Sequence, residues 1–354
     1  MSKWLRSKIS SLSRISGYQK PERYTNVLRM DTNENLALPK KFVARIMMEA
    51  SSKTDPREYP TQQFDELRSR LSKYLNVPKE CIAAGNGSDQ ILDLLLATFA
   101  GDGTTTVTVK PTFTFYKDRC NLHSVKMREV KLNNDFSLDT KKLLSEIGAR
   151  ICYICSPNNP TGNQFDRQAM LDVIRSFNGL VIVDEAYVEF ADYSLKDHVR
   201  KYDNLIVLRT MSKAFGLAGA RVGYMIANRK TAEIFVTTIQ YPYAVSSLSL
   251  KAASIALSKL NYIKLVINQV KKERKRVYDS INAIDDVTAF RSDANFVLFE
   301  VGNRYKTVYR NLIRKGILVR DIGNIDGHRG CLRVTIGTKF MNDKFLQALK
   351  VVCR

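Results

Sequence analysis

The sequence has few of the features that mark specialised classes of protein. No apolar run approaches the roughly 18 residues that a membrane-spanning helix needs, so we expect no membrane segment. The six cysteines are scattered, which excludes a disulfide scaffold, and no second pair stands at zinc spacing to join Cys152 and Cys155. We therefore expect reduced core thiols, no metal ion and a cytoplasmic location.

Acidic residues are few relative to basic ones. The chain has 56 Lys and Arg against 35 Asp and Glu, a formal net charge of +21. Such a charge can indicate a nucleic-acid partner, but the basic residues are dispersed, and the one dense run is Lys271–Arg276. This run falls in a long helical stretch from about residue 246 to 284, where we expect a solvated helix face. We predict no nucleic-acid partner, because a positive field also attracts small anionic substrates.

The order of the apolar runs predicts two domains. With 354 residues and 44% hydrophobic content, the chain can bury a sizeable core. Strand-like runs at 104–109, 151–155, 180–184, 204–208 and 222–227 alternate with helical patterns, which predicts a mostly parallel α/β sheet covered on both faces. Later runs at 295–300, 317–319 and 331–336 predict a smaller α+β domain. We expect an N-terminal segment (1–30), a large domain (31–245) and a small C-terminal domain (246–354).

The first 14 residues are basic, rich in serine and free of acids. Leu5, Ile9 and Leu12 stand at helical spacing. This composition fits a targeting segment or an arm helix that packs on the small domain or on a partner subunit. We favour the arm, because the segment continues into residues 17–23 without a linker.

The most informative segment surrounds Lys213. It follows the apolar run 204–208, with hydroxyls at Thr210 and Ser212 and with Arg221 eight residues on. An amine at the end of a core strand can lose its proton by desolvation and attack a carbonyl, and its three polar neighbours could hold a phosphate. The segment predicts a Schiff-base lysine with pyridoxal phosphate, against the alternative of a solvated loop lysine.

A second segment adds an acid. The run Leu180–Asp184 has the apolar character of a strand buried on both faces, so Asp184 stands at its carboxyl end, where α/β sheets place ligand chemistry. A buried carboxylate needs a cation, and a protonated pyridine nitrogen would serve, while Tyr187 could donate to the phenolate oxygen of the same ring. Apolar residues before Asp-Glu also suggest an ATPase, but the G-x-x-x-x-G-K-[ST] phosphate loop is missing from the sequence.

Two further loops fit the same ligand. In Ser156–Gly162 (SPNNPTG), a proline-fixed turn could present the Asn159 amide to the phenolate oxygen, although an ordinary turn has the same composition. The glycines at 85 and 87 precede an apolar helical pattern, so Ser88 and Asp89 stand at a helix N-terminus, where free N–H groups favour a phosphate. An ordinary helix cap remains the alternative.

Together and in this order, these segments resemble the fold-type I pyridoxal-phosphate aminotransferases, and among them the histidinol-phosphate aminotransferases, over residues 18–348. The resemblance implies that Lys213 forms the Schiff base and moves the proton, that Asp184 pairs with the pyridine nitrogen, and that Tyr187 and Asn159 hold the phenolate oxygen. It implies that the phosphate is held by Ser88, Asp89, Thr210, Ser212 and Arg221.

The same resemblance assigns two aromatic residues. Phe113 occupies the position where the family stacks a tyrosine on the cofactor ring, and Tyr116 is a possible substitute. Tyr59 matches a tyrosine that reaches the phosphate of the neighbouring subunit. The implied assembly is a homodimer with shared active sites.

Three residues match positions that bind the substrate in this family. Tyr18 would lie near an imidazole ring, and Arg320 and Arg333 would receive the anionic end, since arginine binds carboxylate and phosphate alike. The implied reaction, in histidine biosynthesis, converts imidazole-acetol phosphate and L-glutamate to L-histidinol phosphate and 2-oxoglutarate. A threonine-phosphate decarboxylase or an aromatic aminotransferase of the same fold stays open, as does a basic nucleic-acid-binding protein.

Overall fold

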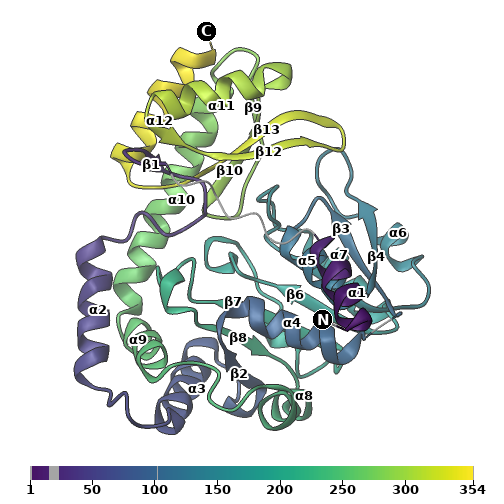
Figure 1. Cartoon of the computed structure of the whole chain (residues 1–354). Coiled ribbons are helices and arrows are strands. Elements are labelled where there is room, and N and C mark those ends of the chain that lie inside the picture. The colour runs from purple at the N-terminus through teal and green to yellow at the C-terminus, as the bar shows by residue number, and fades with distance from the viewer. Residues whose placement is uncertain (1, 16–23, 102, 354) are drawn as a thin grey trace.

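The structure is a computed structural model that describes residues 2–15, 24–101 and 103–353. The large sheet and the small sheet lie in separate parts of the molecule, and the long helix α10 (Leu260–Asn282) extends from one part to the other (Figure 1). Tyr18, which is expected to lie near the substrate, is outside the described residues.

The large sheet has seven strands in the order β2-β8-β7-β6-β5-β3-β4. Their bounds are β2 (Ile82–Gly85), β3 (Thr105–Lys110), β4 (Lys126–Lys131), β5 (Ala149–Cys155), β6 (Leu180–Asp184), β7 (Leu205–Thr210) and β8 (Gly223–Ile226). The strands from β4 to β7 in this order pair in parallel, whereas β8 is antiparallel to both of its neighbours. This confirms the mostly parallel α/β sheet.

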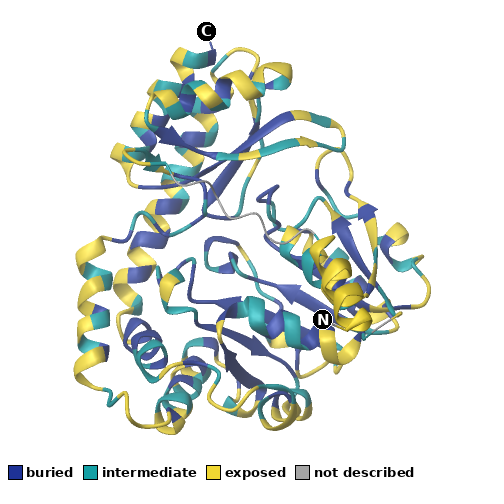
Figure 2. Ribbon diagram, in the orientation of Figure 1, coloured by how far each residue is buried: buried dark blue, intermediate teal, exposed yellow. Residues whose placement is uncertain are grey.

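Helices cover both faces of the large sheet, which explains why its central strands are apolar throughout (Figure 2). On one face, Ile182 and Ile206 pack with α4 (Gly87–Phe99), α5 (Thr114–Leu122) and α8 (Arg229–Ile234). On the other face, their strand neighbours Val183 and Val207 pack with α3 (Thr61–Leu75), α7 (Arg167–Ser176) and α9 (Ser247–Ser258). Because side chains alternate along a strand, Asp184 and Thr210 fall on the α4 face.

The small sheet is antiparallel, in the order β12-β13-β10-β9. Its elements are β9 (Thr288–Ala289), β10 (Phe296–Glu300), β12 (Arg320–Ile325) and β13 (His328–Thr335), with α11 (Tyr305–Arg314) and α12 (Lys339–Cys353) beside them. The run at 317–319 does not join this sheet. It forms β11 (Ile317–Leu318), which pairs in parallel with β1 (Leu28–Arg29) and so ties the N-terminal segment to the small-sheet region.

The long helical stretch is two helices, α9 and α10 (Leu260–Asn282), separated at Lys259. The prediction that the basic run Lys271–Arg276 forms a solvated helix face is wrong in part, because only some of its side chains are exposed. Lys272 and Lys275 are exposed, but Lys271 donates to the Ala191 carbonyl at 3.0 Å and Arg274 donates to the Ala294 carbonyl at 2.9 Å. Lys271 and Arg274 therefore join α10 to neighbouring loops.

Every residue of α1 (Lys3–Ser13) is exposed, so this helix does not pack into the small domain. The remaining elements are α2 (Lys40–Ser52), α6 (Thr140–Leu144), the short 3-10 helices η1 (Lys79–Cys81), η2 (Val188–Phe190), η3 (Lys196–His198), η4 (Ala218–Ala220) and η6 (Gly302–Arg304), and the π-helix η5 (Phe235–Ile239). Among the described residues, no helix has both the length and the apolar character needed to cross a membrane.

Candidate active site

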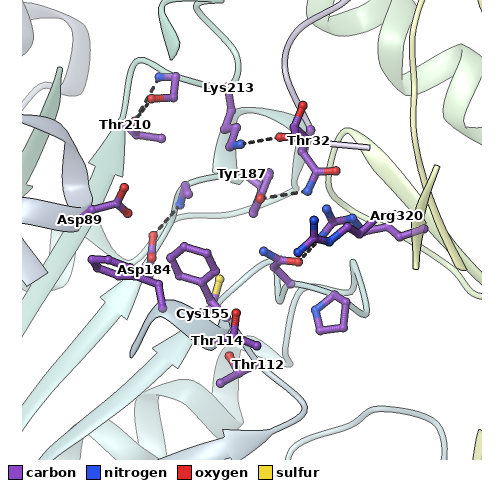
Figure 3. Close-up of a pocket in the computed structure, with 18 of the residues that line it drawn as sticks. Thr32, Asp89, Thr112, Thr114, Cys155, Asp184, Tyr187, Thr210, Lys213 and Arg320 are labelled. Carbon is purple, nitrogen blue, oxygen red and sulfur yellow. Dashed lines mark hydrogen bonds between the residues drawn. The ribbon is translucent and has the colours of Figure 1, made fainter. Parts of the chain in front are cut away.

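One pocket of about 570 Å³ opens between the carboxyl ends of the large-sheet strands and the β12–β13 hairpin. Most of the residues predicted for the site line it, and Figure 3 shows Lys213, Tyr187 and Asp184 among them. The predicted residues in its wall are Ser88, Asp89, Phe113, Asn159, Asp184, Tyr187, Thr210, Ser212, Lys213, Arg221, Arg320 and Arg333.

Lys213 lies three residues beyond β7, in a loop that is buried on both sides of it. Its Nζ donates to the Thr32 carbonyl at 3.2 Å and lies 5.6 Å from the centre of the Tyr187 ring. Burial, with a contribution from Arg333, lowers the pKa of this amine to about 8. A neutral, nucleophilic amine is therefore accessible near neutral pH.

Asp184 is buried at the end of β6, where it lines the pocket floor. Its Oδ1 accepts from the Ala186 N–H at 3.1 Å, and its Oδ2 accepts from the Tyr153 hydroxyl at 2.9 Å. Burial raises the pKa of this carboxyl to about 6, so it is mostly ionised at neutral pH. A buried carboxylate at a pocket surface is suited to a cationic partner.

Two side chains that can donate hydrogen bonds, those of Tyr187 and Asn159, line the pocket with Lys213 and the arginines. The Tyr187 hydroxyl accepts from Asn33 Nδ2 at 3.1 Å, and burial raises its pKa, so its own proton stays available for donation. The Asn159 Oδ1 accepts from the Arg333 guanidinium, which leaves the amide nitrogen of Asn159 as its donor. Both side chains line the pocket, as predicted.

The start of α4 and the loops after β7 form a polar cradle. The Thr210 hydroxyl donates to Ser212 Oγ at 2.9 Å, and Arg221 Nη2 pairs with Asp89 Oδ2 at 2.9 Å. Gly87 has a φ of +79°, and a Cβ there would lie 2.5 Å from Arg221 Nη2. The glycine therefore lets the guanidinium lie against the helix start, where free N–H groups favour an anion.

The two arginines stand opposite each other on the hairpin, since Arg320 of β12 is registered with Arg333 of β13. Arg333 is buried, donates to the Asp31 carbonyl at 2.9 Å and lies 5.0 Å from the centre of the Phe296 ring. Arg320 is half-buried, and within the described residues its guanidinium has no hydrogen-bond or ion-pair partner. The pair can therefore receive an anion between a fixed guanidinium and a free one.

Of the three aromatic residues Phe113, Tyr116 and Tyr59, only Phe113 lines the pocket. Phe113 lines the pocket at the start of α5. Tyr116 is fully buried between α5 and the large sheet, with its ring stacked 4.3 Å from that of Tyr153, and it does not line the pocket, so it is not the substitute. Tyr59 lies outside the pocket, 75% exposed, with its ring stacked 4.5 Å from the half-exposed Tyr243.

The structure adds residues that the sequence patterns did not assign. Thr32 and Asn33 reach Lys213 and Tyr187 from the segment before α2, and Ile322 and Ile325 line the pocket from β12. Tyr153 contacts Asp184 from the neighbouring strand, β5. In sequence, Tyr153 is one residue of an apolar strand, and only the pairing of β5 with β6 brings it to the acid.

The residues present fit pyridoxal phosphate. The pocket contains the Lys213 amine, whose pKa is lowered, and the Asp184 carboxylate, which suits a ring nitrogen. It also contains two donors that suit a ring oxygen, the aromatic ring of Phe113 and a cradle that can take a phosphate. The glycine at the helix start makes room that a side chain would fill.

Comparisons with known proteins point to one family. A family model described as "Aminotransferase class I and II" matches residues 25–349. Histidinol-phosphate aminotransferase of Ruminiclostridium cellulolyticum is 36% identical, with 99% of this chain and 98% of the relative covered. The same-named protein of Thermoanaerobacter sp. is 33% identical, over 98% and 97%. The crystal structure of histidinol-phosphate aminotransferase from Sinorhizobium meliloti in complex with pyridoxal-5'-phosphate superposes with a TM-score of 0.85 at 25% identity, over 92% of this chain and 90% of that one.

Proposed function

The chain belongs to the class I and II aminotransferase family, and we propose that it acts as a histidinol-phosphate aminotransferase that uses pyridoxal phosphate. The reaction would convert L-glutamate and imidazole-acetol phosphate to 2-oxoglutarate and L-histidinol phosphate. The observation that carries the proposal is the Lys213 amine, with its pKa of about 8, in one pocket with Asp184, the polar cradle and two arginines.

Bound pyridoxal phosphate supplies an aldehyde and an electron-withdrawing ring. In the proposal the Asp184 carboxylate keeps the ring nitrogen protonated, while the Tyr187 hydroxyl and the Asn159 amide donate to the ring oxygen. Phe113 would pack against the ring. The residues that would hold the phosphate are those of the cradle where helix α4 begins, namely Ser88, Asp89, Thr210, Ser212 and Arg221.

The Lys213 amine has two tasks in this scheme. In its neutral form it would bind the cofactor aldehyde, and Nζ would hold and move the proton of the substrate α-carbon. The Thr32 carbonyl, 3.2 Å from Nζ, holds the amine at the pocket wall. Burial lowers its pKa and so keeps the base form populated near neutral pH.

Arg320 and Arg333 would bind the anionic end of each substrate in turn. The glutamate side chain carries a carboxylate and imidazole-acetol phosphate carries a phosphate, and a guanidinium binds both with paired hydrogen bonds. The isoleucines of β12, Ile322 and Ile325, add apolar surface to the same pocket wall.

We also infer a homodimer in the cytoplasm. The stacked Tyr59 and Tyr243 are exposed, and Tyr241, two residues before Tyr243 in sequence, is 64% exposed. Exposed aromatic groups of this kind are typical of interfaces. In the proposed dimer Tyr59 reaches the phosphate of the partner's site. The free, buried state of all six cysteines is compatible with a reducing compartment.

Two assays test the proposal. The purified protein should be yellow, and its absorbance band should disappear on borohydride treatment and be missing from Lys213→Ala. A colourless wild-type protein after incubation with pyridoxal phosphate would contradict the cofactor assignment.

The substrate is tested separately. Glutamate and imidazole-acetol phosphate together should yield 2-oxoglutarate with multiple turnovers, whereas glutamate alone should yield no more than one equivalent per active site. Release of carbon dioxide from threonine phosphate would instead assign the protein to the decarboxylases of the same fold. Turnover with aromatic keto acids at a higher kcat/KM would assign it to the aromatic aminotransferases.

A further inference from the structure

Tyr153 contacts the acid of the site without lining the pocket. It lies in the middle of β5, whose register with β6 pairs Tyr153 with Ile182 and Cys155 with Asp184. The ring therefore lies on the same face of the sheet as Asp184, and its hydroxyl donates to Asp184 Oδ2 at 2.9 Å. Both residues are buried, so water does not compete for this hydrogen bond.

The position of this hydroxyl is fixed by a second aromatic ring. Tyr116 of α5 stacks on Tyr153 with ring centres 4.3 Å apart and planes 15° from parallel. Both rings are fully buried among the apolar side chains of α4 and α5. The ring of Tyr153 has no room to swing away, and its hydroxyl is held toward the carboxylate.

The carboxylate has few donors. Within the described residues, the Ala186 N–H bonds Oδ1 and the Tyr153 hydroxyl bonds Oδ2, and no other group donates to this side chain. Burial raises the pKa of Asp184, whereas the hydrogen bond from Tyr153 lowers it. Burial and the nearby Asp184 raise the pKa of Tyr153, so its hydroxyl stays a neutral donor at working pH.

We infer that Tyr153 is a positioning residue that holds the Asp184 carboxylate ionised and aimed at the ring nitrogen of the cofactor. The inference rests on the proposed function, because it needs pyridoxal phosphate in the pocket. A hydroxyl donor stabilises an ionised carboxylate more than a protonated one. Tyr153 thus favours the form of Asp184 that keeps the ring nitrogen protonated.

Other titratable groups also surround Asp184. Electrostatic interactions link Asp184 to Cys155 of β5, Asp89 of α4, Tyr187 and the adjacent Glu185. The negative groups Asp89 and Glu185 raise the pKa of Asp184, in the same direction as burial. Tyr153 opposes all three influences, so its removal should shift the titration of Asp184 upward.

The test is Tyr153→Phe, which keeps the stacked ring and removes one oxygen. Its matched control is Tyr116→Phe, which removes the hydroxyl from the other ring of the same buried stack. Pyridoxal phosphate affinity is measured by absorbance titration of the apoprotein, and kcat/KM is measured against pH. Thermal unfolding checks that both variants fold, with melting temperatures expected close to each other.

Tyr153→Phe should weaken cofactor affinity on the order of tenfold, as expected for one hydrogen bond to a charged group, and should move the acid limb of the pH profile upward. Tyr116→Phe should leave both unchanged. In an Asp184→Asn background, the Tyr153→Phe substitution should have little further effect. The inference is overturned if Tyr153→Phe behaves as Tyr116→Phe does, or if its effect persists undiminished without Asp184. A wild-type protein that fails to bind the cofactor at all would instead remove the proposed function, and the inference with it.

Discussion

Among the single residues, Lys213 has the property on which the proposed chemistry depends. Its position after β7 was predicted from sequence, because an apolar strand followed by hydroxyls and an arginine is a local pattern. The contact of Nζ with the Thr32 carbonyl could not be predicted, since the two residues are far apart in sequence. Burial is what lowers the amine pKa to about 8.

This pKa gives a prediction for cofactor capture. Only the neutral amine attacks the aldehyde, and below about pH 8 most of the Lys213 amine is protonated. The rate at which the apoprotein takes up pyridoxal phosphate should therefore rise with pH and level off above about pH 8. Stopped-flow absorbance measures it. A rate still rising through pH 10, near the pKa of an ordinary lysine at about 10.4, would contradict the account.

A second prediction concerns Arg320, which has a free guanidinium among the described residues. Arg320→Gln should raise KM for both substrates by about 10- to 100-fold, since hydrogen bonds to a charged group are lost, and should leave the melting temperature unchanged. The control is Arg329→Gln, an exposed arginine of the same hairpin that lies outside this pocket. Equal kinetics for the two variants would argue against substrate binding by Arg320.

Among the elements, strands β6 and β7 each end with a site residue on one face and a charged residue on the other. Asp184 and Thr210 line the pocket, whereas Glu185 and Arg209 form a buried ion pair at 2.9 Å, with Glu189 3.6 Å from the same arginine. The sequence predicted the strands but not this pair. Alternation puts Glu185 and Arg209 on one face, but their meeting depends on the pairing of β6 with β7.

Removal of Arg209 should destabilise the large sheet. Arg209→Met leaves two carboxylates buried without a cation, which costs about 3–5 kcal/mol when one partner of a buried pair is removed. Urea unfolding should show this loss. The control Arg175→Met removes an exposed pair with Asp172, for which a change below about 1 kcal/mol is expected. A similar loss of unfolding free energy for both variants would show that the buried ion pairs of Arg209 do not stabilise the ends of β6 and β7.

On the scale of the whole molecule, the fold class was predictable because parallel strands and their covering helices have distinct apolar patterns. The pairing of β1 with β11 was not, since two residues carry no periodicity. The basic run of α10 misled for a related reason, because Arg274 is charged yet points to backbone carbonyls of neighbouring loops. Sequence gives the type of side chain, whereas tertiary packing decides what it contacts.

The proposed dimer predicts that two variants with different defects recover activity when their subunits are mixed, which a monomer could not do. In the proposed dimer, each active site contains Lys213 of one subunit and Tyr59 of the other. Tyr59→Ala and Lys213→Ala therefore remove residues that different subunits supply to the same site. When the two inactive variants are unfolded, mixed and refolded together, some mixed dimers contain one intact site, and part of the wild-type activity should return. Activity that stays at the level of the separate variants would place Tyr59 outside the active site.

The central claim is that Lys213 binds pyridoxal phosphate covalently, and one measurement tests it directly. The protein is incubated with the cofactor, reduced with borohydride, digested and analysed by peptide mass spectrometry. The peptide containing Lys213 should carry the mass of a reduced pyridoxyl phosphate group, and the corresponding peptide of Lys213→Ala should carry none. Labelling of a different lysine, or of no lysine in the wild type, would contradict it.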